Sequence, residues 1–206
     1  MEQIVFSIGT YNVSALELFS VIAGIWAVYL AARENILSWP IGLLNITSAF
    51  FIYYQVRLYS DMFLQIYFFG IGIYGWYVWK NEKRDKLPLK WLSTNQRFTL
   101  AALIAICTLV FGYWMTKIHI QFPSLFPVAA AYPYADTWVA ITSIVANTLM
   151  AKRYIENWIL WIVVDILCVY LYLQKGIAFV SFEFFIFLIL ACYGLMKWRR
   201  MKNKKG

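Results

Sequence analysis

The sequence predicts an all-α integral membrane protein whose seven transmembrane helices form two parallel three-helix repeats joined by a linker helix. Three observations predict this fold class: the apolar composition, seven segments of spanning length, and a weak internal repeat. Of the 206 residues, 63% are hydrophobic, 20% are aromatic and only 14% are charged. Because a soluble domain of this length cannot bury so much apolar side chain in its interior, lipid must solvate part of it.

Seven apolar segments are long enough to cross a bilayer as helices, which takes roughly 20 residues each. Residues 3–13 precede the first of them, are too short to span, and are expected at the membrane interface. The fifth segment is the most polar, and a polar segment flanked by apolar ones is typical of the inside of a helical bundle. The predicted segments are 15–32, 36–56, 60–80, 98–116, 135–151, 155–174 and 177–197.

The basic residues predict the orientation of the chain in the membrane. There are 18 Lys and Arg residues against 10 Asp and Glu residues. If the N-terminus lies outside, all of the Lys and Arg residues except Arg57, Lys117 and Lys175 fall on the cytoplasmic side. The positive-inside rule therefore predicts an outer N-terminus and a cytoplasmic C-terminus. Because the basic residues cluster between apolar segments and at the C-terminus, and not on one face of a folded domain, we expect no nucleic-acid partner.

The membrane-embedded pattern occurs twice in the chain. Glu34-Asn35-Ile-Leu-Ser-Trp39 recurs as Glu156-Asn157-Trp-Ile-Leu-Trp161, and each copy opens a long apolar segment. The offset between matching positions drifts between 118 and 122 residues, so small insertions are needed. The further matches are Glu17 with Asp136, Leu30 with Leu149, Gln65 with Glu183, and Tyr74-Gly75 with Tyr193-Gly194.

The repeat divides the chain into three parts. Residues 1–80 are the first three-helix repeat with a short N-terminal segment. Residues 81–134 hold a basic inner loop, the linker helix and a Pro-rich outer loop, and residues 135–206 are the second repeat with a basic tail. An odd helix in the middle lets the second repeat enter the membrane in the same direction as the first. Transporters built from such parallel repeats hold their substrate between the halves.

Polar residues inside the apolar segments are the candidate substrate site. Asp165 shares one helical face with Trp161 and Tyr172, and Asn45 lies near the corresponding place in the other half. An ionised Asp near the bilayer centre costs at least ~2.5–3.5 kcal/mol, so it needs a partner, which is a ligand or, in the alternative, a neighbouring helix. An aromatic face beside a carboxylate suits a flat organic cation. The predicted substrate-binding residues are Trp39, Asn45, Gln65, Trp161, Asp165, Tyr172 and Glu183.

Catalytic and metal-binding chemistry is not expected. Cys107, Cys168 and Cys192 lie in separate apolar segments without metal-ligand spacing, and His119 is the single histidine. We find no nucleophile–base pair at usable spacing, so the sequence predicts no enzyme, no metal and no cofactor.

Four motifs resemble those of the Pnu-type vitamin transporters, and the resemblance covers nearly the whole chain. It implies a SWEET-like fold of three, one and three helices, and facilitated diffusion of a vitamin across a bacterial inner membrane. It also implies that a cytoplasmic kinase traps the substrate, and it leaves a homo-oligomer open. The motifs are Gly42-Leu-Leu-Asn45, Leu58-Tyr59-Ser-Asp61-x-x-Leu64-Gln65, Tyr74-Gly75-Trp76-Tyr77-x-Trp79 and Glu156-Asn157-Trp-Ile-Leu-Trp161.

One departure from the family pattern bears on the substrate. Members that carry nicotinamide riboside tend to have Trp-x-x-x-Asn on the sixth helix, whereas this chain has Trp161-Ile-Val-Val-Asp165. An Asn side chain both donates and accepts hydrogen bonds, and an ionised Asp only accepts. We therefore expect a cationic vitamin with an amino donor, which favours thiamine over nicotinamide riboside, the alternative substrate. A non-transporting membrane scaffold is the more remote alternative.

Overall fold

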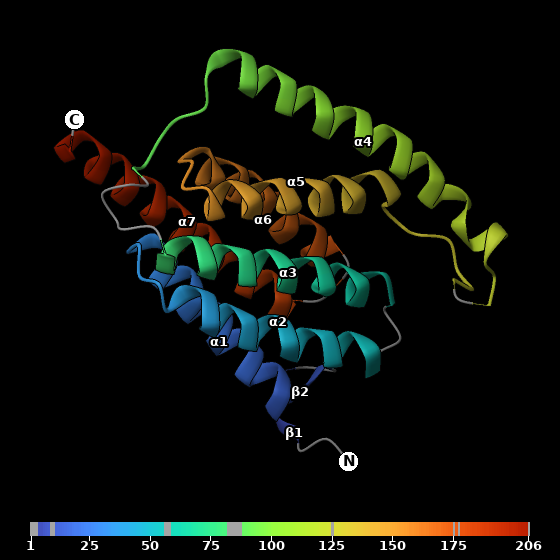
Figure 1. Ribbon diagram of the computed structural model, residues 1–206. Coiled ribbons are helices and arrows are strands. Elements are labelled where there is room, and N and C mark those ends of the chain that lie inside the picture. The colour runs from blue at the N-terminus through green and yellow to red at the C-terminus, as the bar shows by residue number, and fades with distance from the viewer. Residues whose placement is uncertain are drawn as a thin grey trace.

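The computed structural model describes residues 4–8, 11–55, 59–81, 88–124, 126–174, 176 and 178–205. Within these residues the chain forms seven helices and one short β-hairpin (Figure 1). Every predicted spanning segment coincides with a helix, and most boundaries agree within two residues. The helices are α1 (Ala15–Ala32), α2 (Ser38–Gln55), α3 (Tyr59–Asn81), α4 (Thr94–Gln121), α5 (Pro133–Ala151), α6 (Glu156–Gln174) and α7 (Ala178–Lys205).

The N-terminal hairpin is a departure from the expected all-α fold. Strand β1 (Ile4–Ile8) pairs antiparallel with β2 (Tyr11–Ser14). The strands are rich in β-branched and aromatic residues, which favour extended backbone. The hairpin leads directly into α1 through a capping box, in which the Ser14 side chain accepts from the Glu17 N–H and the Glu17 carboxylate accepts from the Ser14 N–H at 2.7 Å. Glu17 therefore stabilises the first turn of α1.

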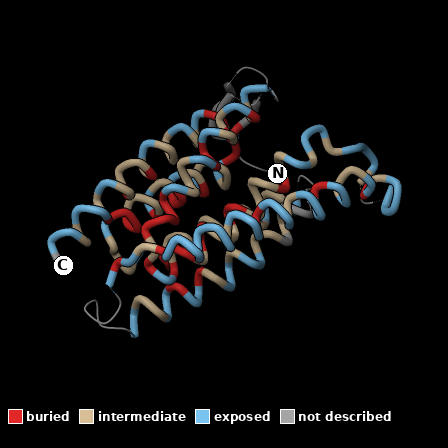
Figure 2. The backbone as a smooth tube through the Cα atoms, turned by 90° about the horizontal axis from the view of Figure 1, so that it is seen from above, coloured by how far each residue is buried: buried red, intermediate tan, exposed pale blue. Residues whose placement is uncertain are grey.

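Among the described residues, four helices are long and apolar enough, by length and composition, to cross a membrane. They are α1, α4, α6 and the segment Val180–Lys204 of α7. The other three helices carry polar residues such as Asn45, Gln65 and Asn147, which lower their hydropathy. A helix that faces a bundle interior can carry such residues because it needs lipid-compatible side chains on one face only. Exposed positions lie along the outer faces of the helices, and buried ones gather in the middle (Figure 2).

Six of the helices form two groups, α1 to α3 and α5 to α7, in which helices that are neighbours along the chain pack on each other. The two groups contact each other through two pairs of helices. Helix α2 packs on α1 and on α3, and α6 packs on α5 and on α7. Between the groups, α1 packs on α7 and α3 on α5. Tyr29 of α1 stacks on Tyr193 of α7 with ring centroids 6.3 Å apart, and Tyr67 of α3 hydrogen-bonds Thr148 of α5 at 2.7 Å. Helix α4 lies along the outer side of α5, away from α1 and α2 (Figure 1).

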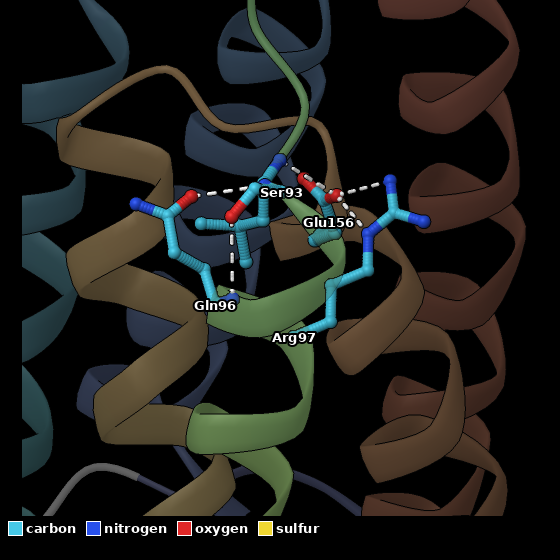
Figure 3. A network of polar contacts seen from close by, with 5 residues as sticks. Ser93, Gln96, Arg97 and Glu156 are labelled. Atoms are coloured by element: carbon cyan, nitrogen blue, oxygen red, sulfur yellow. Dashed lines mark hydrogen bonds and ion pairs between the residues drawn. The ribbon is translucent and has the colours of Figure 1, made fainter.

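The linker helix α4 is fixed at its start to α6 (Figure 3). Glu156 Oε1 accepts hydrogen bonds from Arg97 Nε and from the Leu92 N–H, both at 2.9 Å. A capping box between Ser93 and Gln96 closes the first turn of α4. Glu156 of the Glu-Asn motif thus anchors the start of α4 to α6.

Three helix boundaries relate the two groups of helices by an offset of 119 positions. Helix α1 ends at Ala32 and α5 at Ala151, and α2 ends at Gln55 and α6 at Gln174. The difference is 119 positions in both cases, and the same offset relates the starts of α3 and α7. The starts of α1 and α5, and of α2 and α6, differ by 118 positions. The predicted match of Glu34–Trp39 with Glu156–Trp161 is therefore three residues out of register.

The two turns between the first and second helices of each group confirm the corrected register. Glu34 has φ +53° and Arg153 has φ +63°, a left-handed conformation that is uncommon for residues other than glycine. The hydrogen bond from the Asn35 N–H to the Leu30 carbonyl corresponds to that from the Tyr154 N–H to the Leu149 carbonyl, each 2.9 Å long. Glu34 therefore corresponds to Arg153, and Trp39 corresponds to Trp158.

Candidate functional site

A cavity of about 250 Å³ lies between the two groups of helices. Its walls come from α1, α2, α3, α5, α6 and α7, and among the described residues α4 adds no side chain to the lining. Most of the wall is apolar, with a few amide and carboxyl groups. A concave, mostly apolar space with a few polar groups is typical of a site for a small organic molecule.

Five of the seven predicted substrate residues line this cavity, and two do not. Trp39, Asn45, Gln65, Trp161 and Asp165 are in the lining. The Tyr172 ring stacks on Phe184 with centroids 5.4 Å apart and an interplanar angle of 12°, so it lies one layer behind the wall. Glu183 is half-buried outside the lining. Its inclusion depended on a match to Gln65 at an offset of 118, and at 119 the lining residue Phe184 takes that place.

Asp165 is the charged residue of the cavity wall, and its side chain is 2% exposed. Within the described part of the chain, its carboxylate makes no hydrogen bond and no ion pair. The alternative in which Asp165 joins two helices by a hydrogen bond is thus not seen in the structure. Because an unpaired carboxylate at this depth is costly, the position favours a cationic or hydrogen-bond-donating ligand.

Asn45 has a structural role at the edge of the cavity. Its Nδ2 donates to the Ser20 carbonyl at 2.8 Å and to Ser20 Oγ at 3.1 Å, which ties α2 to α1. Gly24 makes room for this amide, since a Cβ there would lie 3.1 Å from Asn45 Nδ2. With both amide hydrogens used, Asn45 can offer a ligand only its carbonyl oxygen.

Aromatic rings cover much of the remaining wall. Trp39 was predicted from the sequence, while Trp158 and Phe187 were missed. Trp158 stands directly after the Glu-Asn motif, and the correct register would have paired it with Trp39. Asn147 was also missed as a site residue, although its polar helix was predicted to lie inside the bundle.

The lining residues come mostly in pairs that are related by the offset of 119 positions, so the two groups of helices present equivalent places to the same cavity. Polar groups break this equivalence. Asp165 corresponds to Ile46, Gln65 to Phe184, and Asn147 to Val28. The cavity therefore suits an asymmetric ligand in one orientation. The pairs are 28 with 147, 31 with 150, 39 with 158, 42 with 161, 46 with 165, 65 with 184, 68 with 187, and 72 with 191.

Comparison with known proteins agrees with the motifs. The family model described as nicotinamide mononucleotide transporter matches residues 14–200. The nicotinamide riboside transporter PnuC of Escherichia coli (strain K12) is 29% identical over 219 residues, covering 96% of this chain and 90% of the relative. The riboflavin/roseoflavin transporter RibM of Streptomyces davaonensis is 26% identical, covering 86% of this chain and 81% of the relative.

A solved structure has the same fold. The crystal structure of the vitamin B3 transporter PnuC superposes with a TM-score of 0.72 at 24% identity, covering 93% of this chain and 83% of that one. The helices of the present chain are thus those of a multi-pass membrane protein. Together with the family model, which spans nearly the whole chain, this shows that the chain belongs to the nicotinamide mononucleotide transporter family and confirms its resemblance to the Pnu-type vitamin transporters.

Proposed function

We propose that the chain transports nicotinamide riboside by facilitated diffusion across a bacterial inner membrane, with the substrate bound in the cavity. The observation that carries a cationic substrate is the buried Asp165 carboxylate, which has no partner among the described residues and lies in a wall of aromatic rings. Relatives that cover most of this chain are named as nicotinamide riboside transporters. The comparisons therefore favour the alternative substrate of the sequence analysis, and they lend no support to the thiamine preference.

The chemistry of nicotinamide riboside fits the groups in the wall. The substrate has a cationic pyridinium ring, a carboxamide and ribose hydroxyls. A tryptophan face contributes ~0.5–2 kcal/mol to binding a cation, and the carboxylate of Asp165 adds a charge partner or accepts from a hydroxyl. Gln65 and Asn147 line the cavity and can both donate and accept, which suits the carboxamide.

The arrangement that best explains the cavity is three helices, one linker helix and three helices. In this proposal residues 1–80 and 135–206 are parallel repeats, residues 81–134 contain the linker, and the substrate lies between the repeats. The offset of 119 positions and the paired lining residues support it. The positive-inside rule favours an outer N-terminus and a cytoplasmic C-terminus, because Lys80, Lys152 and Lys197 share one end of the bundle.

We expect transport to be passive. A coupled carrier needs an ion site beside the substrate, and in this proposal Asp165 pairs with the substrate cation instead of with a coupling ion. In this proposal a cytoplasmic kinase traps the vitamin by family analogy.

An uptake assay in a strain without vitamin carriers tests the function. Labelled nicotinamide riboside, thiamine and riboflavin are offered in parallel, and calorimetry on purified protein gives the affinities. We expect uptake and binding of nicotinamide riboside, unaffected by an ionophore. Uptake of thiamine alone would restore the thiamine hypothesis. Normal folding without binding of any of the three vitamins would favour a scaffold.

A further inference from the structure

Two pairs of equivalent residues touch each other at one end of the cavity. Glu34 and Arg153 form an ion pair, and the rings of Trp79 and Trp198 have centroids 6.2 Å apart. Each pair is 119 positions apart, the offset that relates the two groups of helices. Residues related by a two-fold operation can contact each other only near its axis. Both contacts therefore mark the place where the two repeats meet symmetrically.

Each of these tryptophans also donates to a carbonyl at a helix end in the opposite group of helices, and the Ala31 carbonyl accepts in addition from the Glu34 N–H at 3.0 Å. Trp79 Nε1 donates to the Ala151 carbonyl at the end of α5, and Trp198 Nε1 donates to the Ala31 carbonyl near the end of α1, both at 3.2 Å. The last four carbonyls of a helix have no partner within the helix. Because Ala31 is 3% and Ala151 0% exposed, water does not replace these bonds in the closed arrangement.

The two tryptophans, Trp79 and Trp198, also support the wall of the cavity. Trp39 meets Trp79 edge to face at 5.3 Å and 86°, and Trp158 meets Trp198 at 5.5 Å and 87°. Trp39 and Trp158 line the cavity. A movement that separates Trp79 from Trp198 would therefore also move a pair of rings that contact the bound substrate.

The ion pair has features of a switch. Both side chains are buried, with 7% of Arg153 and 2% of Glu34 exposed. A buried ion pair is weak evidence for stability because desolvation offsets its attraction, so its position needs another explanation. Both residues also hold the left-handed backbone conformation, and such strain is found where the surrounding structure imposes it, often at functional sites.

We propose that Glu34, Arg153, Trp79 and Trp198 form a latch between the repeats that closes the cavity at its basic end and opens to release substrate. Arg33, Lys80, Lys152 and Lys197 lie around this end, so the latch faces the cytoplasm in the proposed orientation. The inference rests on the proposed transport function, and it adds to it the residues that gate one side.

A charge exchange tests the latch. The double variant Glu34→Arg with Arg153→Glu places the same ion pair on equivalent positions with its ends exchanged. Ile46→Cys supplies a thiol in the cavity wall, in a background where Cys107, Cys168 and Cys192 are replaced by Ala. A membrane-impermeant thiol reagent is added to inside-out vesicles, and the labelling rate reports how often the cytoplasmic side opens.

We expect Glu34→Gln and Arg153→Gln to be labelled about tenfold faster, since each 1.4 kcal/mol lost from the closed state is a tenfold change in its population. The exchanged pair should return the rate towards that of the parent. Trp198→Phe keeps an aromatic ring, removes the N–H and should also speed labelling. It provides a second test should the exchanged pair fail to fold. Arg97→Gln breaks an ion pair outside the latch, between α4 and α6, and is the matched control.

Two outcomes separate this inference from the proposed function. If the latch variants are labelled faster while the parent chain takes up none of the vitamins, the latch is supported and the transport proposal is refuted. Unchanged labelling in folded single variants and in Trp198→Phe, with uptake intact, would overturn the latch alone.

Discussion

Ile46 and Asp165 occupy equivalent positions in the two repeats, and both line the cavity, yet one is apolar and the other acidic. The cavity thus receives its charge from α6 and not from α2. At the equivalent place in α2 the wall is hydrocarbon, so in the proposed function a cationic substrate has one favourable orientation.

Replacing the carboxylate of Asp165 by an apolar side chain should weaken binding and preserve the fold. Asp165→Leu removes a desolvated charge partner, which commonly costs about 2–5 kcal/mol, or roughly 30-fold and more in affinity. Asp165→Asn should lose less, because it gives the Trp-x-x-x-Asn pattern of members that carry nicotinamide riboside and its amide still accepts hydrogen bonds. Calorimetry with nicotinamide riboside measures the change, and a melting curve checks folding. Glu183→Leu makes a similar change outside the cavity lining and should leave the affinity unaltered, whereas an unchanged affinity in Asp165→Leu would remove Asp165 from the site.

Moving the carboxylate to the other repeat should recover part of the lost affinity. Asp165→Ile alone should abolish measurable binding, because it leaves the cation without a charge partner. Adding Ile46→Asp restores a carboxylate at the equivalent place in the cavity. Recovery should be partial, since Gln65 and Asn147 keep their original positions. Calorimetry measures the affinity of the single and of the double variant. If the folded double variant binds as weakly as Asp165→Ile alone, positions 46 and 165 do not have equivalent environments.

Removing the indole of Trp161 should weaken the binding of cationic and of neutral ligands to a similar degree. Trp161→Ala loses stacking and shape at a position where the other repeat has only Gly42, so no equivalent ring can compensate. A loss of about 0.5–2 kcal/mol is expected, with a neutral analogue affected in similar proportion. Trp114→Ala on α4 serves as the control because that ring is exposed outside the cavity. Equal affinities in the parent and Trp161→Ala would exclude stacking at this position.

Adding a methyl group behind Trp39 should destabilise the protein. A Cβ at Gly75 would lie 2.3 Å from Cη2 of Trp39, so the indole would have to move. Overpacking of this kind typically costs about 1–3 kcal/mol, and Gly75→Ala should lower the melting temperature. Gly70→Ala, on the same helix, meets nothing within 4 Å and should instead be neutral or stabilising by about 0.5–1 kcal/mol. Equal melting temperatures for the two variants would contradict this packing.

The helices were predictable because long apolar segments have a strong signal, but their ends were less so. Helix α4 begins at Thr94 and ends at Gln121, beyond the predicted 98–116, because helical hydrogen bonding continues into polar residues that add nothing to hydropathy. The same applies to the end of α7 at Lys205. The hairpin was missed since its strands are short and its sequence is as apolar as the helices that follow.

The site was predictable in its residue types and less so in its register. Identical letters in Glu34-Asn35 and Glu156-Asn157 suggested a match that the backbone does not follow. Glu34 pairs with Arg153, whereas Glu156 accepts from Arg97 and from the Leu92 N–H, so the two acids have different structural roles. The shared turn geometry and the helix ends select the offset of 119, which the matches of Leu30 with Leu149 and of Tyr74-Gly75 with Tyr193-Gly194 already had. Glu183 entered the predicted site through a similar one-residue error.

The pairing of cavity positions also separates what the two halves have kept in common from what has diverged. Trp39 and Trp158, Gly75 and Gly194, and Trp79 and Trp198 are identical across the halves, and they contact one another at the end of the cavity where the proposed latch lies. At the cavity positions 28 with 147, 46 with 165, and 65 with 184, the halves differ. If both descend from one duplicated ancestor, the machinery of movement was inherited as a symmetric unit while recognition was free to specialise on one side. Descendants of such an ancestor could then acquire new cargo by point changes in the cavity, without rebuilding the parts that move.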